Sequence, residues 1–174
     1  IKKSNFVLSL IILIMTSVTL MACNDNDDVI EASNDIVDIA ARTPNLSILV
    51  QAAERAGLVG ALKSSDIKTV FAPTNTAFQA LLDSNSSWSS LNDIPVETLQ
   101  SVLLFHVLGA AVKSTDLSDT YVNTSATGPN GEPFSLQVET KGTVEFNGDA
   151  KPITVDITAS NGVIHIIDKV MLPP

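Results

Sequence analysis

The chain has 174 residues, of which 45% are hydrophobic and 17% charged, with a single Cys and a formal net charge of −9. This length suits one domain, and the apolar fraction excludes a disordered chain. One Cys excludes an intramolecular disulfide framework and a cysteine-based zinc cluster. The 19 acidic residues outnumber the 10 basic ones, and only 5% of residues are aromatic, so nucleic acid is excluded as a partner.

The amino-terminal segment is strongly hydrophobic. Lys2 and Lys3 are followed by an uncharged stretch, Phe6–Ala22, which ends at the only Cys of the chain, Cys23. A basic start, an apolar stretch and small residues at its end are typical of a secretory signal peptide. Residues 20–23 resemble the lipobox of bacterial lipoproteins, which implies cleavage before Cys23 and acylation of that residue. The alternative is an uncleaved signal anchor with an ordinary Cys, although the stretch is short for a membrane span.

The next segment is acidic and polar. Residues 24–34 are rich in Asp and contain little that could pack into a core, so we interpret residues 23–34 as a lipid-anchored tether. The acidic residues also resemble the surface-export signal of some bacterial lipoproteins. Two roles for this segment therefore stay open, a solvated linker and an export signal. Loss of the predicted signal peptide, residues 1–22, would leave 152 residues with a net charge of −11. We expect a cell-envelope protein, anchored by lipid and facing the periplasm or the cell surface.

The first half of the remaining chain, residues 35–174, has helical periodicity. Apolar residues repeat at intervals of three and four over residues 35–41, 46–53 and 77–82, and again after Pro95. Pro44 separates the first two of these helices. One short apolar run, residues 68–72, predicts a buried strand, and Thr74 after it is a suitable helix cap.

The second half predicts strands. Alternating or β-branched runs cover residues 134–138, 144–146, 153–157 and 163–170. Three Asn-Gly pairs, at positions 130, 147 and 161, predict hairpins because both residue types tolerate a positive φ. Helices followed by hairpins predict an α+β fold in which the helices lie over part of an antiparallel sheet system.

Three segments in this order resemble the fasciclin domain family. Residues 69–78 resemble its first conserved box, residues 103–107 its Tyr-His motif, and residues 161–173 its second box. The resemblance covers residues 35–174 and implies a wedge-shaped β-sandwich of about seven strands with a helical layer. It also implies extracellular adhesion and association with matrix or carbohydrate, without a catalytic site or an obligatory cofactor.

The positions that carry the family motifs are Thr74, Asn75, Phe105, His106 and His165. Two positions depart from the family pattern. Phe105 replaces the usual Tyr, so the phenolic hydroxyl is missing, and Thr76 replaces the usual acidic residue. A hydrogen bond between His106 and Thr74, Asn75 or Thr76 stays open on the sequence alone, as does the identity of the partner among the three.

No pattern in the sequence predicts catalysis or metal binding. The chain contains only two His, and neither belongs to an HExxH motif or to a pair with metal-binding spacing. We interpret both as framework residues. A Ser-His-Asp triad stays open on residue types alone, but the G-x-S-x-G turn of a serine hydrolase is absent from the sequence. We therefore expect a protein that is not an enzyme and that binds no cofactor.

Binding is the function that remains. We expect a lipid-anchored domain for cell adhesion or for matrix or carbohydrate interaction, with the bilayer, through acylated Cys23, and an envelope protein or an extracellular glycan or protein as partners. The alternative is an accessory subunit that docks on the extracytoplasmic side of a membrane protein complex. Candidate contact surfaces are residues 116–131 and the loop that carries Trp88, since an exposed Trp suits such contacts. Packing of Trp88 against the following helix is the alternative for that residue.

Overall fold

The computed structural model of the chain describes residues 34–174. Residues 34–174 form one compact domain that carries both hydrophobic core clusters, so this part of the chain has the core it needs to fold on its own. The predicted signal peptide, the acylated Cys23 and the tether up to residue 33 lie outside the described residues. Within residues 34–174, no helix is both long and apolar enough to cross a membrane.

Within residues 34–174 there are five α-helices. Four of them form where the sequence has helical periodicity, and the remaining one, Val59–Lys63, is a short helix outside those segments. Asp35 caps the first one through a hydrogen bond from Asp38 N to its carboxylate, at 2.8 Å. Short 3-10 turns connect or follow the helices at Pro44–Leu46, Leu91–Asp93 and Ser114–Asp116. The helices are α1 (Ile36–Arg42), α2 (Ser47–Arg55), α3 (Val59–Lys63), α4 (Asn75–Ser84) and α5 (Val96–Phe105).

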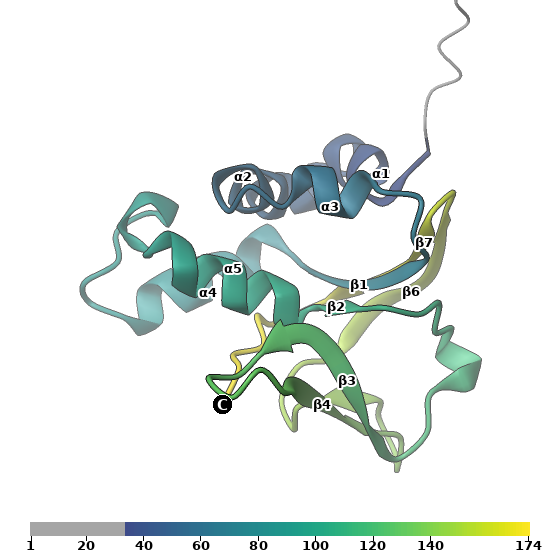
Figure 1. Cartoon of the computed structure of the whole chain (residues 1–174). Helices are drawn as coiled ribbons and strands as arrows, with labels where there is room; N and C mark the ends of the chain where they lie inside the picture. Colours follow the sequence, from purple (N-terminus) through teal and green to yellow (C-terminus); the bar gives the residue numbers. More distant parts are fainter. Residues whose placement is uncertain (1–33) are drawn as a thin grey trace, which may run out of the picture. The chain divides into compact units, whose positions relative to one another are not determined.

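In the described part of the chain seven strands form two sheets, so the predicted α+β architecture with about seven strands is confirmed. One sheet has the order β2-β1-β7-β6 and the other the order β3-β4-β5, and Figure 1 shows the β3–β4 hairpin as a layer of its own. The strands are β1 (Lys68–Pro73), β2 (Val107–Leu108), β3 (Thr120–Thr127), β4 (Pro133–Glu139), β5 (Glu145–Phe146), β6 (Pro152–Ala159) and β7 (Gly162–Ile167).

The four-stranded sheet is mixed, which corrects the prediction of an antiparallel system. Strand β1 pairs with β7 in parallel, from Lys68 opposite Gly162 to Pro73 opposite Ile167. A parallel pair needs a crossover connection, and here the crossover contains two helices and all the other strands. Strand β7 also ends at Ile167, earlier than the predicted residue 170, and the backbone beyond it bonds to the His106 side chain through Met171 N.

The three Asn-Gly pairs form different turns. In the pair Asn147-Gly148 both residues have positive φ, at 54° and 74°, as the hairpin prediction requires. In Asn130-Gly131 only the Gly does, at 79°. In the β6–β7 hairpin Ala159 pairs with Gly162, so that Asn161 lies inside the two-residue turn and Gly162 begins the strand. Two of the three pairs therefore make turns of another kind than predicted.

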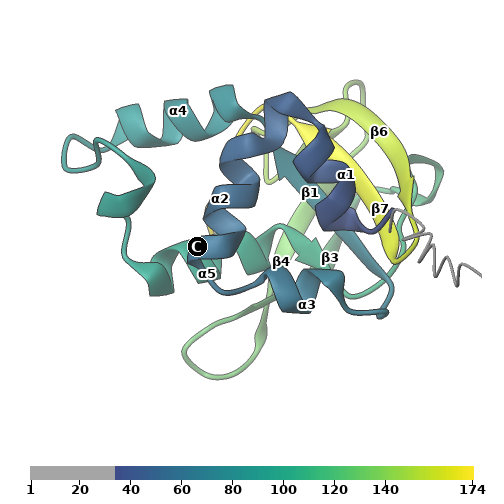
Figure 2. The same ribbon diagram turned by 90° about the horizontal axis from the view of Figure 1, so that it is seen from above.

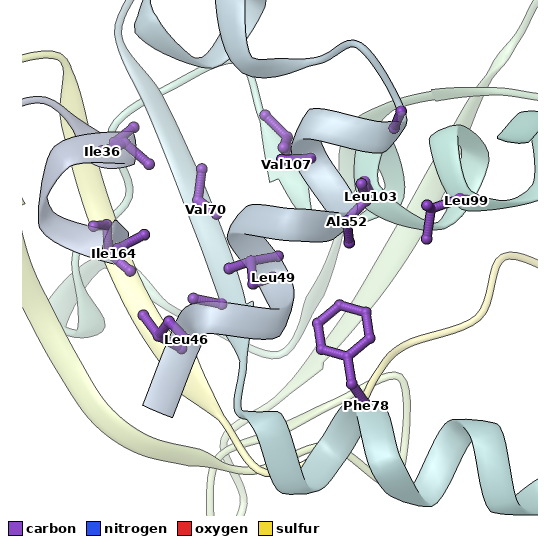
Figure 3. Packing of buried hydrophobic residues seen from close by; sticks show 14 of the residues in the cluster. Ile36, Leu46, Leu49, Ala52, Val70, Phe78, Leu99, Leu103, Val107 and Ile164 are labelled. Atoms are coloured by element: carbon purple, nitrogen blue, oxygen red, sulfur yellow. The ribbon is translucent and has the colours of Figure 1, made fainter. Parts of the chain in front are cut away.

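Two hydrophobic clusters stabilise the domain. The first fills the space between the helices and the four-stranded sheet, and Figure 2 shows α1 and α2 lying over β1 and β7. In Figure 3, side chains from α2, α4 and α5 meet in this cluster, among them Leu49, Phe78 and Leu99. The second cluster contains Phe71 and Phe146, whose ring centroids lie 4.5 Å apart, and it joins the two sheets. Burial of apolar surface on this scale is the main contribution to stability.

Candidate functional site

His106 lies at the carboxyl end of α5 and is 1% exposed. Its Nδ1 lies 2.7 Å from the carbonyl oxygen of Val102, and its Nε2 accepts a hydrogen bond from the backbone N–H of Met171 at 3.0 Å. Because Nε2 is an acceptor, the neutral ring carries its proton on Nδ1. Burial lowers the pKa of His106 to about 4, so the ring is neutral at pH 7. Both ring nitrogens are thus used by the framework, as the sequence predicts.

The residues of the first family box hold helices in place. Thr74 caps α4, since its Oγ1 accepts a hydrogen bond from Ala77 N at 3.2 Å. The side chain of Asn75 accepts from Ile48 N at 2.9 Å and donates to Pro44 O at 3.0 Å, so it joins the start of α4 to the start of α2. The hydrogen bond that the sequence left open between residues 74–76 and His106 does not form, because both nitrogens of His106 have other partners.

Phe105, which replaces the family's usual Tyr, is fully buried. Its ring packs edge-on against Phe134 of β4, with the centroids 6.3 Å apart and the planes at 79°. The ring belongs to the second hydrophobic cluster. Its role in this chain is therefore packing between α5 and the three-stranded sheet.

His165 is a second framework residue, on β7. Its Nδ1 accepts a hydrogen bond from Asp156 N at 3.2 Å, its Nε2 lies 2.8 Å from Val112 O, and its ring stacks on Phe71 with centroids 5.5 Å apart. The segment before β3 is thereby held against the sheet. The side chain is fully buried and both nitrogens have partners.

Ser114, Asp156 and His165 come together, yet their connections differ from those of a catalytic triad. The hydroxyl of Ser114 donates to the carboxylate of Asp156, not to the imidazole, and Ser114 N donates to the same carboxylate at 2.7 Å. These bonds hold the pKa of Asp156 below its usual range. A triad needs a hydrogen bond between the nucleophile and the histidine base. Here the imidazole instead bonds to the backbone, so the cluster holds Asp156 at its left-handed φ of 60°.

Residues 34–174 contain no group of three or more His, Cys, Asp or Glu side chains that could hold a metal ion. Trp88, a predicted contact residue, is half-buried and packs against the first hydrophobic cluster. The cluster draws residues from several elements, so packing against the following helix in particular stays a prediction, and only part of the Trp88 side chain is available to a partner. The surface role of Trp88 therefore stays a prediction.

The other predicted contact segment, residues 116–131, contains an exposed aromatic residue. Tyr121 of β3, the only Tyr of the chain, is 67% exposed and lies opposite Gln137 of β4 in the sheet register. Along β3 the exposed positions alternate with inward-facing ones such as Thr124 and Ala126. This register places Tyr121 on the outer face of the three-stranded sheet, away from the second cluster.

Polar groups surround Tyr121 on a shallow depression of about 510 Å³, which we call the Tyr121 surface. Asp119 at its edge accepts hydrogen bonds from Thr140 N at 2.6 Å and Thr140 Oγ1 at 2.7 Å, and these bonds lower the pKa of Asp119. The amine of Lys141 lies 3.4 Å from the same carboxylate. The surface is lined by Asp119, Thr120, Tyr121, Gln137, Val138, Glu139 and Lys141.

An aromatic ring beside fixed donors and acceptors is suited to binding a partner that offers both an apolar face and polar groups. The contact surface predicted from the sequence, residues 116–131, did not single out Tyr121 and did not include Gln137. The available signal was the alternation in residues 120–127, which puts the Tyr on the same face as Asn123 and Ser125. The contribution of β4 could not be read before the strand pairing was known.

Comparison with known proteins gives one family. The family model described as "Fasciclin domain" matches residues 44–173. The Synechocystis protein sll1483 is 38% identical over 144 residues, covering 83% of this chain and 76% of that protein. A second Synechocystis protein, sll1735, is 37% identical over 138 residues and is covered over 97% of its length. The immunogenic protein MPB70 of Mycobacterium bovis is 29% identical over 148 residues, which cover 82% of this chain and 71% of MPB70.

A solved structure has the same fold. It is a pair of FAS1 domains from the insect cell adhesion molecule fasciclin I, with a TM-score of 0.65 and 16% sequence identity. The match covers 80% of this chain and 51% of that chain, so the domain described here spans about half of the pair. At this identity the comparison establishes the fold alone.

Proposed function

The chain belongs to the fasciclin domain family, and we propose that it is an extracytoplasmic adhesion domain that binds a matrix or carbohydrate partner through the Tyr121 surface. The exposure of Tyr121, 67%, is the observation that carries this proposal. Large aromatic side chains that reach solvent beside polar groups are typical of binding surfaces, because the ring offers much contact area at little entropic cost.

The adhesion role is supported by the match to the fasciclin domain family, whose members are implicated in cell adhesion and matrix interaction. A binding role is also supported by the buried and half-buried polar side chains, which serve the framework of the domain. His106, His165, Asn75 and Asp156 are all engaged in internal hydrogen bonds, so they are not available to substrates. The Tyr121 surface is the place where an aromatic ring and charged groups face solvent together.

Attachment to a membrane through acylated Cys23 is part of the proposal. It is supported by the sequence pattern before Cys23 and by the acidic segment after it. Acyl chains contribute about 0.8 kcal/mol per buried methylene, so more than one chain gives stable anchoring. Replacement of Cys23 by Ala should move the protein from the membrane to the soluble fraction. Retention in the membrane with an uncleaved leader would show that a helix is the anchor instead.

The binding role is tested with cells that display the full chain. Adhesion to immobilised glycans and to matrix proteins is compared for the wild type, Tyr121→Ser and Ile153→Ser. Ile153 is the matched control, because it is 59% exposed and lies on β6 of the other sheet. We expect adhesion to fall at least about tenfold in Tyr121→Ser, as for a central aromatic contact, and to be unchanged in Ile153→Ser.

The accessory-subunit alternative predicts a different result. A stoichiometric complex that survives gentle detergent extraction, together with adhesion that is equal in all three proteins, would favour docking on a membrane protein and would overturn the adhesion proposal. Recovery of the chain alone, with adhesion dependent on Tyr121, supports the adhesion proposal.

A further inference from the structure

A cavity of about 240 Å³ that opens to solvent lies along the first hydrophobic cluster and reaches Phe71 and Leu104 of the second. Helices α1, α2 and α3 form one side of it, and strands β1 and β2 with helix α5 form the other. Figure 3 labels residues that line it from five different elements: Ile36, Leu49, Val70, Leu103 and Val107. Protein interiors contain few voids larger than a water molecule, so a cavity of this size is an unusual feature of a core.

The cavity exists because three helices present alanine where larger aliphatic residues would fill it. Ala40 of α1, Ala53 of α2 and Ala61 of α3 all line it. Their neighbours in the same lining include Leu49 and Leu62, which are full-sized core residues. A leucine in place of any one of the alanines would take up part of the space.

The lining offers water few partners. Of its three polar side chains, His106 has both ring nitrogens engaged elsewhere. The amine of Lys68 donates to Ser64 Oγ at 2.6 Å and to Asp66 O at 2.9 Å, and Ser125 is exposed at the surface. A buried water needs two to four hydrogen-bond partners, so the interior of the cavity favours apolar atoms over water.

The cavity has a route to solvent beside α3. This helix has only five residues, and none of them is buried. Ala61 is exposed, while Leu58 and Leu62 are half-buried at the edge of the cavity. A helix with so few buried contacts unfolds locally at a lower free-energy cost than the rest of the core. Local unfolding of α3 would let a ligand enter the cavity.

We propose that this cavity is a binding site for a small uncharged hydrocarbon group, such as a short aliphatic chain. An engineered apolar cavity of about 150 Å³ binds benzene, and the present cavity is larger. The site shares no residue with the Tyr121 surface, so the inference does not rest on the proposed adhesion function. The lining favours an uncharged ligand, because His106 is neutral with both ring nitrogens bonded and the amine of Lys68 is held by Ser64 and Asp66.

The test uses the compact domain, residues 34–174, labelled with ¹⁵N and titrated with n-octanol, with glycerol as the polar control. We expect saturable shifts of the amides of Ala40, Ala53 and Ala61, no shift at Tyr121, and no response to glycerol. The variant Ala53→Leu should bind n-octanol at least about tenfold more weakly and melt at a higher temperature without ligand, because the new side chain fills the cavity. Ala80→Leu, on the exposed side of α4, is the matched control and should bind as the wild type does.

Three results would overturn the proposal. They are the absence of saturable shifts up to the solubility limit of n-octanol, equal affinity of a folded Ala53→Leu, and shifts spread equally over Tyr121 and α4. If Ala53→Leu fails to fold, Ala61→Leu takes its place, because Ala61 is exposed at the edge and tolerates a larger side chain. That variant must then weaken the binding of n-octanol, and unchanged affinity would again contradict the proposal.

Discussion

His106 and Met171 are 65 residues apart in the sequence and are joined by a hydrogen bond of 3.0 Å from Met171 N to His106 Nε2. Because the same ring also bonds to Val102 O, one buried imidazole links the end of α5 to the carboxyl-terminal segment. The bond needs a neutral ring with a free lone pair on Nε2. The family's conserved histidine is therefore part of the framework here, and its protonation should weaken the fold.

The first prediction concerns pH. Burial lowers the pKa of His106 from its ordinary value of 6.5 to about 4 in the folded protein, so the unfolded chain takes up the proton first as the pH falls. The contribution of neutral His106 to the free energy of unfolding is fully present above pH 6.5 and is lost as the pH falls towards 4. We expect the free energy of unfolding to decrease by about 3 kcal/mol over this interval. Urea denaturation at several pH values measures it.

The variant His106→Gln separates this effect from other titrations. Gln has no titratable group, so the pH dependence between 6.5 and 4 should be smaller by the contribution of His106. The lowered pKa values of Asp119 and Asp156 place their effects at lower pH than this interval. An equal slope in wild type and variant would show that His106 does not titrate as described.

The second prediction concerns Asn161, which is 4% exposed. Its side chain accepts from Ile36 N at 3.0 Å and donates to Leu62 O at 2.7 Å and Ser64 O at 2.9 Å, so it fastens α1 and α3 to the β6–β7 turn. Asn161→Ala leaves these backbone groups without partners and should cost about 2–4 kcal/mol, measured by chemical denaturation. Asn130→Ala, in the exposed β3–β4 turn, is the control and should change stability by less than about 0.5 kcal/mol. Similar losses in both would contradict the role of Asn161.

The third prediction concerns Gly162, where β7 passes very close to β1. A Cβ atom at this position would lie 1.9 Å from Lys68 O, and φ is 153°. The two backbones cannot separate without breaking the parallel ladder, so Gly162→Ala should cost more than about 4 kcal/mol or prevent folding. Circular dichroism and thermal melting report the loss.

Gly109 provides the matched control for Gly162. A Cβ atom there would meet nothing within 4 Å, and the residue is exposed. Gly109→Ala should therefore keep the stability of the wild type within about 0.5 kcal/mol. A folded Gly162→Ala with the stability of Gly109→Ala would show that the close approach of β1 and β7 is wrong.

Local signals predicted the helix starts and caps correctly, although two of the three Asn-Gly turns differ from the prediction. The cap at Thr74 and the helices that begin after Pro44 and Pro95 depend on residues only a few positions apart, so the sequence contains all the information they need. The resemblance of three ordered segments to the fasciclin family supplied the number of strands and the helical layer. These parts of the fold were predictable before the structure.

Long-range relationships were not predictable in the same way. The parallel pairing of β1 with β7 joins segments about 95 positions apart, as in Lys68 opposite Gly162, and no local pattern distinguishes it from an antiparallel pair. The Asn-Gly pair at Asn161 was read as a turn signal, whereas its importance lies in hydrogen bonds to α1 and α3. Tyr121 became a candidate only when its register opposite Gln137 placed it on the outer face.

The most direct test of the central claim, that the Tyr121 surface contacts the partner, is photo-crosslinking on intact cells. The full chain carries benzoyl-phenylalanine at position 121 or, as the control, at position 153, and both sites are exposed in the free protein. We predict one dominant cross-linked species from position 121 and none of it from position 153. Cross-linking of the same species with equal yield at both positions, or at position 153 alone, would contradict the assignment of the binding surface.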